Sequence, residues 1–216
     1  MRVSSGKMAV IIIGAVLAID QAVKIWIKTH MALNDEFAVF GDWFIIHFTE
    51  NPGMAFGITF GGDWGKLLLS LFRIVLVVFI GIYLVKLSRR TTTPRGAMAG
   101  LSLILAGAAG NILDSLFYGL LFDHSAGQVA SFLPESGGYA SFLHGKVVDM
   151  LYFPIIKDAA GDPVFFRPIF NIADAAITTG ILYLLLFHRR FFAARKIQPA
   201  DESVKYEACD KHISNT

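Results

Sequence analysis

Two aspartates, Asp149 and Asp174, are the residues of this chain whose type and position are best suited to chemistry. Asp174 lies where the chain enters its last apolar segment, and Asp149 lies in the connection before that segment. A carboxylate at membrane depth is costly, so it is a functional candidate by default. Two carboxylates in one site can hold one proton between them and act on water as acid and base. The elements that carry them decide whether the two side chains meet.

Composition indicates a membrane protein. Of 216 residues, 55% are hydrophobic and only 17% are charged, which is too apolar for an ordinary soluble domain. A helix needs about 20 residues to cross a bilayer. Four segments have that length, and they cover residues 7–28, 66–87, 97–122 and 170–188. We therefore predict an all-α integral membrane fold with four transmembrane helices in a single domain, residues 1–190.

The basic residues predict the orientation. Lys and Arg lie before the first segment, between the second and third, and after the fourth, whereas the other connections are mixed or acidic. Basic residues stay cytoplasmic, so both termini are expected inside, including a polar tail over residues 191–216. An alternative is that the first segment is a cleaved signal peptide, because Val16–Ala18 resembles a cleavage site. We favour a retained helix, because the apolar pattern resumes over Ala22–Ile27 and cleavage would move the C-terminal basic residues outside.

Two extracytoplasmic connections are expected. The first, residues 29–65, contains an alternating pattern over Glu36–Glu50 that predicts β-structure and leads into the turn-rich run Asn51–Gly57. The second contains an insertion over residues 123–145 that is rich in Gly and Ser. The insertion is interpreted as a disordered linker or as a lid over the site, and the lid is favoured.

Strongly polar residues of the apolar segments lie at a common depth. A helix rises about 1.5 Å per residue, so Asp20 lies about 18 Å into a hydrocarbon core of about 30 Å. Asn111 and Asp114 lie about two-thirds of the way across by the same rise, and Asn171 begins the last segment. Arg73 lies near the outer end of the second segment, where it is interpreted as pairing or snorkelling. All fall in the outer half, which indicates one shared site.

Each polar group also has a purely structural explanation. Asp20 and Lys24 are four residues apart and can form an intrahelical ion pair. Asn171 has the spacing of a helix cap with an acid in the first turn. The polar groups of the third segment can join helices across the small residues Gly107–Gly110. A shared site accounts for all of these groups with one cause.

Other chemistries lack their motifs. No cluster of His, Cys or Glu has the spacing of a zinc site, and no phosphate-binding loop or serine-hydrolase elbow is present. We expect no metal, no cofactor and no nucleic-acid partner. A proton-coupled transporter and a non-enzymatic scaffold remain as alternatives. Four spans without an internal repeat argue against the transporter, and the polar groups gathered at one depth argue against the scaffold.

Five blocks together resemble the ordered motifs of lipoprotein signal peptidase, the type II signal peptidase of bacteria. They are Asp20-Gln21-x-x-Lys24, Asn51-x-Gly53-x-Ala55-Phe56-Gly57, Gly110-Asn111-x-x-Asp114, Val147-Val148-Asp149 and Phe170-Asn171-x-Ala173-Asp174. The resemblance covers about Met8 to His188. Two positions depart from the family pattern: Ser115 follows Asp114 where the family usually has Arg, and Met150 stands where an aromatic residue is common.

The resemblance implies an intramembrane aspartic endopeptidase of the bacterial inner membrane, with its site near the outer face. Such an enzyme removes the signal peptide from lipid-modified prolipoproteins by cutting before the diacylglyceryl-cysteine. The resemblance also implies that Asp149 and Asp174 form the catalytic dyad, and that the protein contacts membrane lipid and binds the peptide antibiotic globomycin. Nine further residues of the motifs would support the site or bind substrate; they are Asp20, Lys24, Asn51, Gly53, Gly110, Asn111, Asp114, Asn171 and Ala173.

Overall fold

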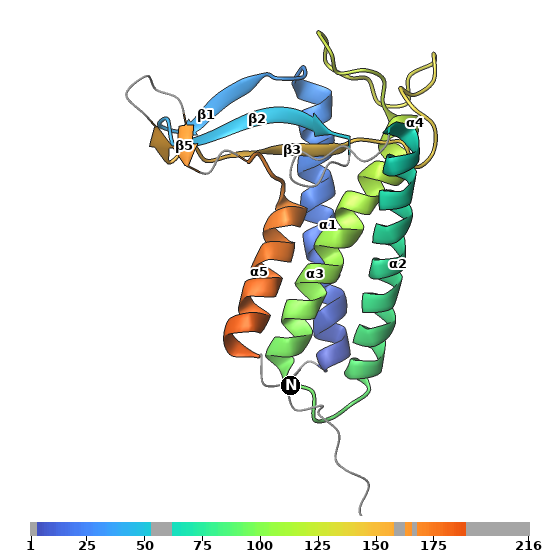
Figure 1. Ribbon diagram of the computed structural model, residues 1–216, viewed down its shortest axis with the longest axis vertical. Coiled ribbons are helices and arrows are strands. Elements are labelled where there is room, and N and C mark those ends of the chain that lie inside the picture. Colours follow the sequence, from blue (N-terminus) through green and yellow to red (C-terminus); the bar gives the residue numbers. More distant parts are fainter. Residues whose placement is uncertain (1–3, 53–61, 158–162, 166–167, 189–216) are drawn as a thin grey trace, which may run out of the picture.

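Long helices stand side by side, and a small sheet lies across one end of them (Figure 1). The computed structural model describes residues 4–52, 62–157, 163–165 and 168–188. The long helices are α1 (Ser5–His30), α2 (Gly62–Ser88), α3 (Arg95–Leu113) and α5 (Ile172–Phe187). Helix α3 packs against each of the other three. It is therefore the element through which polar groups of different helices can meet.

The outward faces of the helices are apolar. Val10, Phe79 and Leu186 are each about 70% exposed, at 70%, 71% and 70%. Contiguous apolar surface of this extent is unfavourable in water and suits a lipid environment. Three described helices are long and apolar enough to cross a membrane, namely Ser5–His30, Ser70–Ser88 and Arg95–Leu121. The fourth expected span corresponds to α5, which is a shorter apolar helix of 16 residues.

Small residues bring α3 and α5 into close contact. A Cβ atom added to Gly107 of α3 would overlap the carbonyl oxygen of Ala173 in α5. One turn further along α3, a Cβ on Gly110 would lie 2.8 Å from a carboxylate oxygen of Asp20. Only glycine permits this approach without displacing a neighbour, so these positions set the distance between the polar groups of α1, α3 and α5.

The third apolar segment is continuous but changes its winding near the outer end. The segment predicted as one helix over residues 97–122 is divided into α3, the π-helix η1 (Asp114–Tyr118) and the short α4 (Gly119–Leu121). A π-turn inside an α-helix is rare and is found often at functional sites. It begins here at Asp114, one of the expected site residues.

A three-stranded antiparallel sheet carries Asp149. Its strands are β1 (Glu36–Phe40), β2 (Phe44–Asn51) and β3 (Val147–Tyr152), in that order. The prediction of β-structure over Glu36–Glu50 is confirmed. The placement of Asp149 in a loop is wrong, because Asp149 lies opposite Thr49 in the β2–β3 ladder. Strand β3 is buried from Val147 to Met150 and so lacks the alternation that would have revealed it.

Shorter elements complete the sheet end of the molecule. A two-stranded sheet pairs β4 (Ile156–Lys157) with β5 (Pro163–Phe165). The insertion over residues 123–145 is held by backbone hydrogen bonds, such as that from Leu33 N to Ser125 O at 2.8 Å. It is therefore packed against the helix ends and is not a free linker; its interpretation as a lid stays a prediction.

Candidate active site

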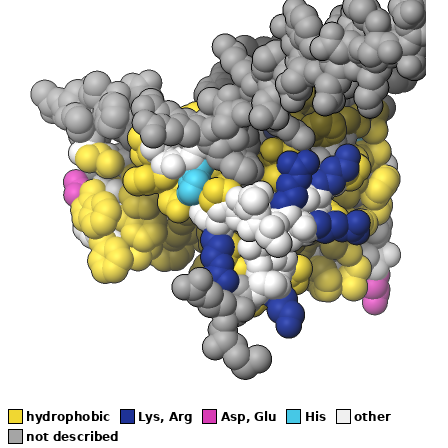
Figure 2. All heavy atoms as spheres, turned by 90° about the horizontal axis from the view of Figure 1, so that it is seen from below, with side chains coloured by type: hydrophobic (Ala, Val, Ile, Leu, Met, Phe, Trp, Pro, Cys, Tyr) yellow, Lys and Arg dark blue, Asp and Glu magenta, His cyan; other side chains and the backbone are white. Residues whose placement is uncertain are grey.

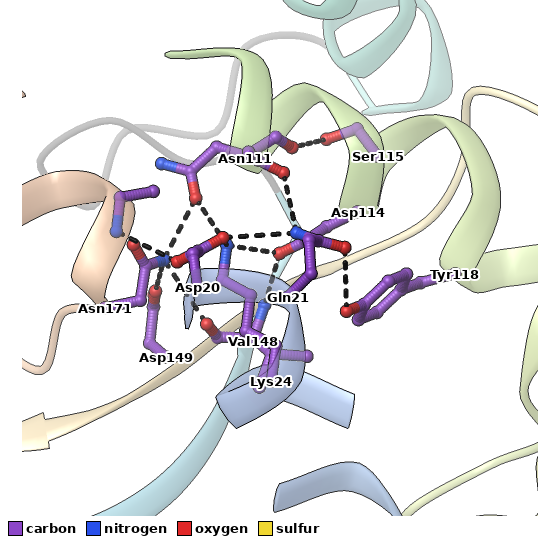
Figure 3. Close-up of polar contacts among 12 residues, drawn as sticks. Asp20, Gln21, Lys24, Asn111, Asp114, Ser115, Tyr118, Val148, Asp149 and Asn171 are labelled. Atoms are coloured by element: carbon purple, nitrogen blue, oxygen red, sulfur yellow. Dashed lines mark hydrogen bonds and ion pairs between the residues drawn. The ribbon is translucent and has the colours of Figure 1, made fainter. Parts of the chain in front are cut away.

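Lys24 of α1 lies at the centre of a buried polar network. Its side chain is 0% exposed, and its Nζ lies 2.9 Å from Asp20 Oδ2 and 2.8 Å from Asp114 Oδ2 (Figure 3). The same ammonium donates a hydrogen bond of 2.9 Å to Asn111 Oδ1. All three donors of Lys24 are thereby used, and two of them reach α3 or its π-turn. The intrahelical pair expected from the sequence exists, but it is one part of a contact between helices.

The two carboxylates beside Lys24 connect this network to further elements. Asp20 Oδ1 accepts a hydrogen bond of 2.9 Å from the backbone N–H of Ala173, in the first turn of α5. Asp114 Oδ2 accepts one of 3.3 Å from the backbone N–H of Val148, next to Asp149 on β3. The network therefore attaches the chain on which each expected catalytic aspartate lies to the helix bundle.

Asn171 caps α5 and also reaches across the site. Its Oδ1 accepts from the Asp174 backbone N–H at 2.9 Å, and Asp174 Oδ2 accepts from the Asn171 backbone N–H at 3.4 Å, which is a capping box. The amide group of Asn171 donates to Asp149 Oδ1 at 2.7 Å and to Asn111 Oδ1 at 3.0 Å. The capping explanation is correct but incomplete, because the same side chain binds the other aspartate.

The two aspartates are each held by an asparagine amide. Asn111 Nδ2 donates to Asp174 Oδ1 at 2.7 Å, as Asn171 Nδ2 does to Asp149 Oδ1. The amides cannot turn over freely. Lys24 has no acceptor, so Asn111 must direct its oxygen to Lys24 and its NH₂ group to Asp174. The orientation of Asn171 is fixed in the same way. The backbone N–H of Asp174 can only donate, so it faces the amide oxygen of Asn171, and the NH₂ group of Asn171 is directed to Asp149.

The electrostatic environment of Asp149 favours its protonated form more than that of an ordinary aspartate does. Burial raises the pKa of the Asp149 carboxyl, the negative charge of Asp174 raises it further, and together they bring it to about 7. Hydrogen bonds from Asn171 and Asn51 oppose this rise. A carboxyl with a pKa near neutrality beside a second carboxyl is the arrangement in which one acid and one base coexist.

The structure brings together most of the residues expected in the site. Asn51, at the end of β2, hydrogen-bonds to Asp149. Gly53 lies outside the described residues. Arg73 on α2 interacts electrostatically with both aspartates. The members of the connected site are Asp20, Lys24, Asn51, Gly110, Asn111, Asp114, Asp149, Asn171, Ala173 and Asp174.

Two residues of the network were not expected as site residues. Gln21 donates to Asp114 Oδ1 at 2.9 Å and to Asp20 Oδ2 at 3.1 Å, and Tyr118 donates to Gln21 Oε1 at 3.2 Å. Gln21 is adjacent to Asp20 in the sequence, and its polar side chain in an apolar helix was the available signal. Tyr118 gave no such signal, because its position one turn after Asp114 depends on the π-helix.

The position after Asp114 is filled by a small buried side chain. Ser115 is 5% exposed, and its hydroxyl donates to the Asn111 carbonyl at 3.1 Å. Its own carbonyl accepts from Gly145 N at 2.9 Å, at the end of the insertion. The residue that replaces the usual arginine thus lies against the insertion.

A second buried cluster joins α1 to the sheet beside the site. Glu50 receives Lys28 Nζ at 2.5 Å and Lys146 Nζ at 2.9 Å, and Lys28 also donates to Ser125 of the insertion at 2.9 Å. Burial alone would raise the pKa of Glu50, but the two ammonium groups lower it below its ordinary value. Because Glu50 precedes Asn51 and Lys146 precedes β3, the cluster helps fix the two strands that reach Asp149.

Carboxylates in this site are bonded to amides and an ammonium. Among the described residues, no group of three or more His, Cys, Asp or Glu side chains is placed to hold a metal ion. Within the same residues, every fully buried side-chain nitrogen and oxygen has a hydrogen-bond partner. The polar groups satisfy one another, which keeps the two aspartates in defined positions.

Apolar helices around buried carboxylates define a helical membrane enzyme, and solved structures share this fold. The chain is similar to two structures described as bacterial membrane enzymes determined by the in meso method. One has a TM-score of 0.59 and 24% identity, covering 89% of this chain and 93% of that chain. The other has a TM-score of 0.56 and 26% identity, covering 88% and 93%.

Sequence comparisons give the family. The model of signal peptidase (SPase) II matches residues 12–190. A lipoprotein signal peptidase of Porphyromonas gingivalis is 46% identical over 198 residues, covering 88% of this chain and 86% of that protein. One of Amoebophilus asiaticus is 34% identical over 210 residues, covering 93% and 84%. The chain belongs to the signal peptidase II family, which consists of bacterial membrane proteases that process prolipoproteins. The resemblance drawn from the five sequence blocks is confirmed.

Proposed function

We propose that this chain is an intramembrane aspartic endopeptidase that cuts prolipoproteins directly before the diacylglyceryl-cysteine. The observation that carries the proposal is the pair of linked asparagines. The amide of each asparagine donates a hydrogen bond of 2.7 Å to one aspartate, and the two amides are hydrogen-bonded to each other. An arrangement that fixes a buried carboxylate, Asp149, and a partly buried one, Asp174, is suited to acid–base chemistry on water.

In the proposed reaction, one carboxylate of the pair is ionised and the other is protonated. The ionised carboxylate takes a proton from a water molecule while the water oxygen attacks the scissile carbonyl. The protonated carboxyl donates to the oxygen of that carbonyl, on which negative charge develops. Collapse of the tetrahedral intermediate breaks the C–N bond, and a proton passes to the leaving amine. The pair then holds one proton again.

The asparagines have a role that charged groups could not fill. An amide donates hydrogen bonds without carrying charge, so it positions a carboxylate with less effect on its pKa than a cation would have. Lys24 is linked to Asp174 only through the side chain of Asn111, which hydrogen-bonds to both. A direct Lys24–Asp174 pair would favour the ionised form and remove the shared proton. The Asn111 amide thus fixes the position of Asp174 without placing the positive charge of Lys24 directly against its carboxylate.

The charge distribution supports an outward-facing site. Lys and Arg side chains gather at the end of the bundle opposite the sheet, seen from below in Figure 2. Four basic residues are exposed here: Lys86 in the last turn of α2, Arg89 and Arg90 in the connection, and Arg95 at the start of α3. Basic residues are retained on the cytoplasmic side, so we assign this end to the cytoplasm and the sheet and site to the outer face. We also assign α5 as the fourth span; its 16 residues are about 24 Å long.

The proposed substrate can leave its acyl chains in the bilayer. A site near the outer end of the helices admits water from outside, while the apolar faces keep contact with lipid. We also propose prolipoproteins carrying diacylglyceryl-cysteine as substrates and globomycin as a ligand, as the resemblance implies.

A metal-free mechanism predicts that chelation leaves activity unchanged. We expect the purified chain, supplied with a lipidated prolipoprotein in detergent or vesicles, to cut at the same rate with and without EDTA. The physical reason is that the water would be activated by a carboxylate and needs no Lewis acid. Product formation on a gel is the measurement. Activity that is lost in EDTA and restored by zinc contradicts this mechanism.

The pH profile follows from the raised pKa of Asp149. With a pKa of about 7, the pair loses its shared proton as the pH rises through neutrality, so activity should fall on the alkaline side of about pH 7. Asn51 hydrogen-bonds to the ionised form and lowers this pKa. We expect Asn51→Ala to move the alkaline limb of kcat upward by roughly half a unit to one unit.

A matched control for the pH series is Asn34→Gly, which changes an exposed asparagine outside the site at a positive φ of 71° that glycine adopts readily. Its limb should coincide with that of the unmodified chain. If the alkaline limb of kcat stays at the same pH in Asn51→Ala, or moves to lower pH, the group whose titration sets that limb is not Asp149.

A further inference from the structure

The insertion, residues 123–145, runs beside the outer end of the third helical segment. Its backbone N–H groups bond to carbonyl oxygens of that segment at successive heights. The pairs, in order along the insertion, are Leu133 to Leu121 at 2.7 Å, Tyr139 to Phe122 at 2.9 Å, Ala140 to Gly119 at 2.9 Å, Leu143 to Leu116 at 3.4 Å and Gly145 to Ser115 at 2.9 Å. The chain therefore descends from the helix end to the level of η1.

These hydrogen bonds pair backbone groups that would otherwise be unsatisfied near lipid. Carbonyl groups in the last turn of a helix have no partner within the helix, and unpaired backbone groups are costly at membrane depth. The insertion supplies donors to this end of the segment and satisfies its own N–H groups in the same contacts. Non-helical chain can thus lie at the membrane boundary without exposing these donors to hydrocarbon.

Large apolar side chains gather where the insertion meets the helix end. We call this set the apolar rim; it consists of Phe117, Leu120, Phe132, Leu133 and Phe142, which are 40%, 46%, 51%, 62% and 49% exposed. Two of them belong to the helical segment itself, in η1 and α4. The rings of Phe117 and Phe142 lie 5.8 Å apart between centroids. The exposed apolar surface of η1 therefore meets that of the insertion at this pair of rings.

Two leucines of the insertion have strained backbone conformations. Leu133 and Leu143 have positive φ angles of 51° and 71°, a conformation that bulky L-residues rarely adopt. Such a conformation costs of order 1–3 kcal/mol per residue and persists only where its surroundings fix it. Both leucines donate their backbone N–H to the helix segment. The strain therefore coincides with two of the five attachment points, one at Leu133 of the rim and one next to Phe142.

Polar residues of the insertion lie away from these attachment points. Residues 126–128 and 135–137 are exposed and read Ala-Gly-Gln and Glu-Ser-Gly, without a large apolar side chain, whereas Val129 is 44% exposed and Gly138 lies against the carbonyl oxygens of Gly119 and Leu120. Figure 1 shows this part of the chain rising beyond α4, away from the helices. The insertion is thus divided by height, with apolar groups at the level of the helix end and polar groups beyond it.

We propose that the apolar rim is a membrane-seating surface, occupied by acyl chains of the outer-leaflet lipid. The occupant follows from continuity, because the rim extends the exposed apolar surface of a helix long enough to span a bilayer. The rim lies at the outer boundary of the bilayer, since Phe117 and Leu120 are 22 and 25 residues beyond Arg95, about 33 and 38 Å, against about 30 Å for the hydrocarbon core and about 40–45 Å with the headgroup regions. The inference goes beyond the proposed function. Because Gly145 leads directly into β3, seating the rim in lipid would also hold Asp149 at a constant depth.

Site-directed spin labelling of the full chain tests the proposal. Cys209, the single native cysteine, is changed to serine, and one label is introduced by Leu133→Cys, Phe142→Cys or, as the matched control, Ser136→Cys. Each variant is reconstituted in vesicles of phosphatidylethanolamine and phosphatidylglycerol. Collision rates are measured with oxygen, which concentrates in lipid, and with a water-soluble nickel chelate. Phe79→Cys, on the exposed face of α2 and outside the rim, provides the lipid reference.

We expect the labels at 133 and 142 to collide more with oxygen than with nickel, as the reference label at 79 should, and the label at 136 to do the reverse. More collision with nickel at both rim positions overturns the proposal. Low collision with both reagents overturns it too, because protein, such as a second copy of this chain, would then cover the rim. If one rim variant fails to elute as a single species, Phe132→Cys replaces it. The measurement uses no substrate, so it is decided independently of the proposed proteolysis.

Discussion

We expect Asp149→Asn and Asp174→Asn each to lower the rate of prolipoprotein cleavage by roughly 10²- to 10⁴-fold, the contribution of a positioned acid or base. Asparagine keeps the size of the side chain but can neither take a proton from water nor hold the shared one. Both aspartates already accept hydrogen bonds from amides. The variants should therefore lose kcat while the chain still inserts and elutes as the unmodified protein does. Rates measured on a defined lipidated substrate check this.

Asp35→Asn is the matched control for these two variants. Asp35 is exposed and its side chain accepts a hydrogen bond within its own turn, from Ala32 N at 2.8 Å, so its replacement should leave cleavage unchanged. Near-normal turnover in either Asp149→Asn or Asp174→Asn would exclude that residue from the dyad. Equal losses in both variants and no loss in the control are the expected pattern.

Lys24→Met is expected to have the largest effect on stability. It leaves Asp20 and Asp114, which are 1% and 0% exposed, as two buried carboxylates without their cation. Breaking a buried ion pair by removing one partner costs about 3–5 kcal/mol, because the remaining charge is uncompensated. It also removes the donor that orients Asn111. Thermal unfolding in detergent, followed by loss of the folded elution peak, should show a large decrease in Tm.

The control for that variant is Lys86→Met, which removes an exposed lysine from α2 and should leave Tm nearly unchanged. A further variant separates charge from packing. If unpaired charge is the cause, combining Lys24→Met with Asp20→Asn and Asp114→Asn should recover part of the lost stability. An unchanged Tm in Lys24→Met, or a triple variant less stable than the single one, would contradict the assigned role of Lys24.

The depth of polar groups was predictable from the sequence for a physical reason. Helix rise is nearly constant, so the positions of Asp20, Asn111 and Asn171 along apolar segments give their heights directly. The structure joins these groups through Lys24 and Asp174 in one network. What periodicity could not give was the partner of each group, because the contact between α3 and α5 depends on Gly107 and its close approach to Ala173.

Asp149 was placed in the site by resemblance and not by hydropathy. It lies on β3, whose pairing with β2 joins residues about 100 positions apart, and no local pattern encodes such a contact. Burial of four successive β3 residues removes the alternation typical of a half-exposed strand. The π-turn at Asp114 and the attachment of the insertion were equally hidden, since both depend on hydrogen bonds between distant segments.

Mass spectrometry of the products from one defined lipidated prolipoprotein tests the central claim most directly. The purified chain is compared with Asp149→Asn and Asp174→Asn, and with a substrate in which the lipid-bearing cysteine is replaced by serine. We predict a single cut, at the peptide bond directly before the diacylglyceryl-cysteine, made by the unmodified chain alone and only in the lipidated substrate. A cut at another bond, or the same cut made at a normal rate by either aspartate variant, would contradict the account.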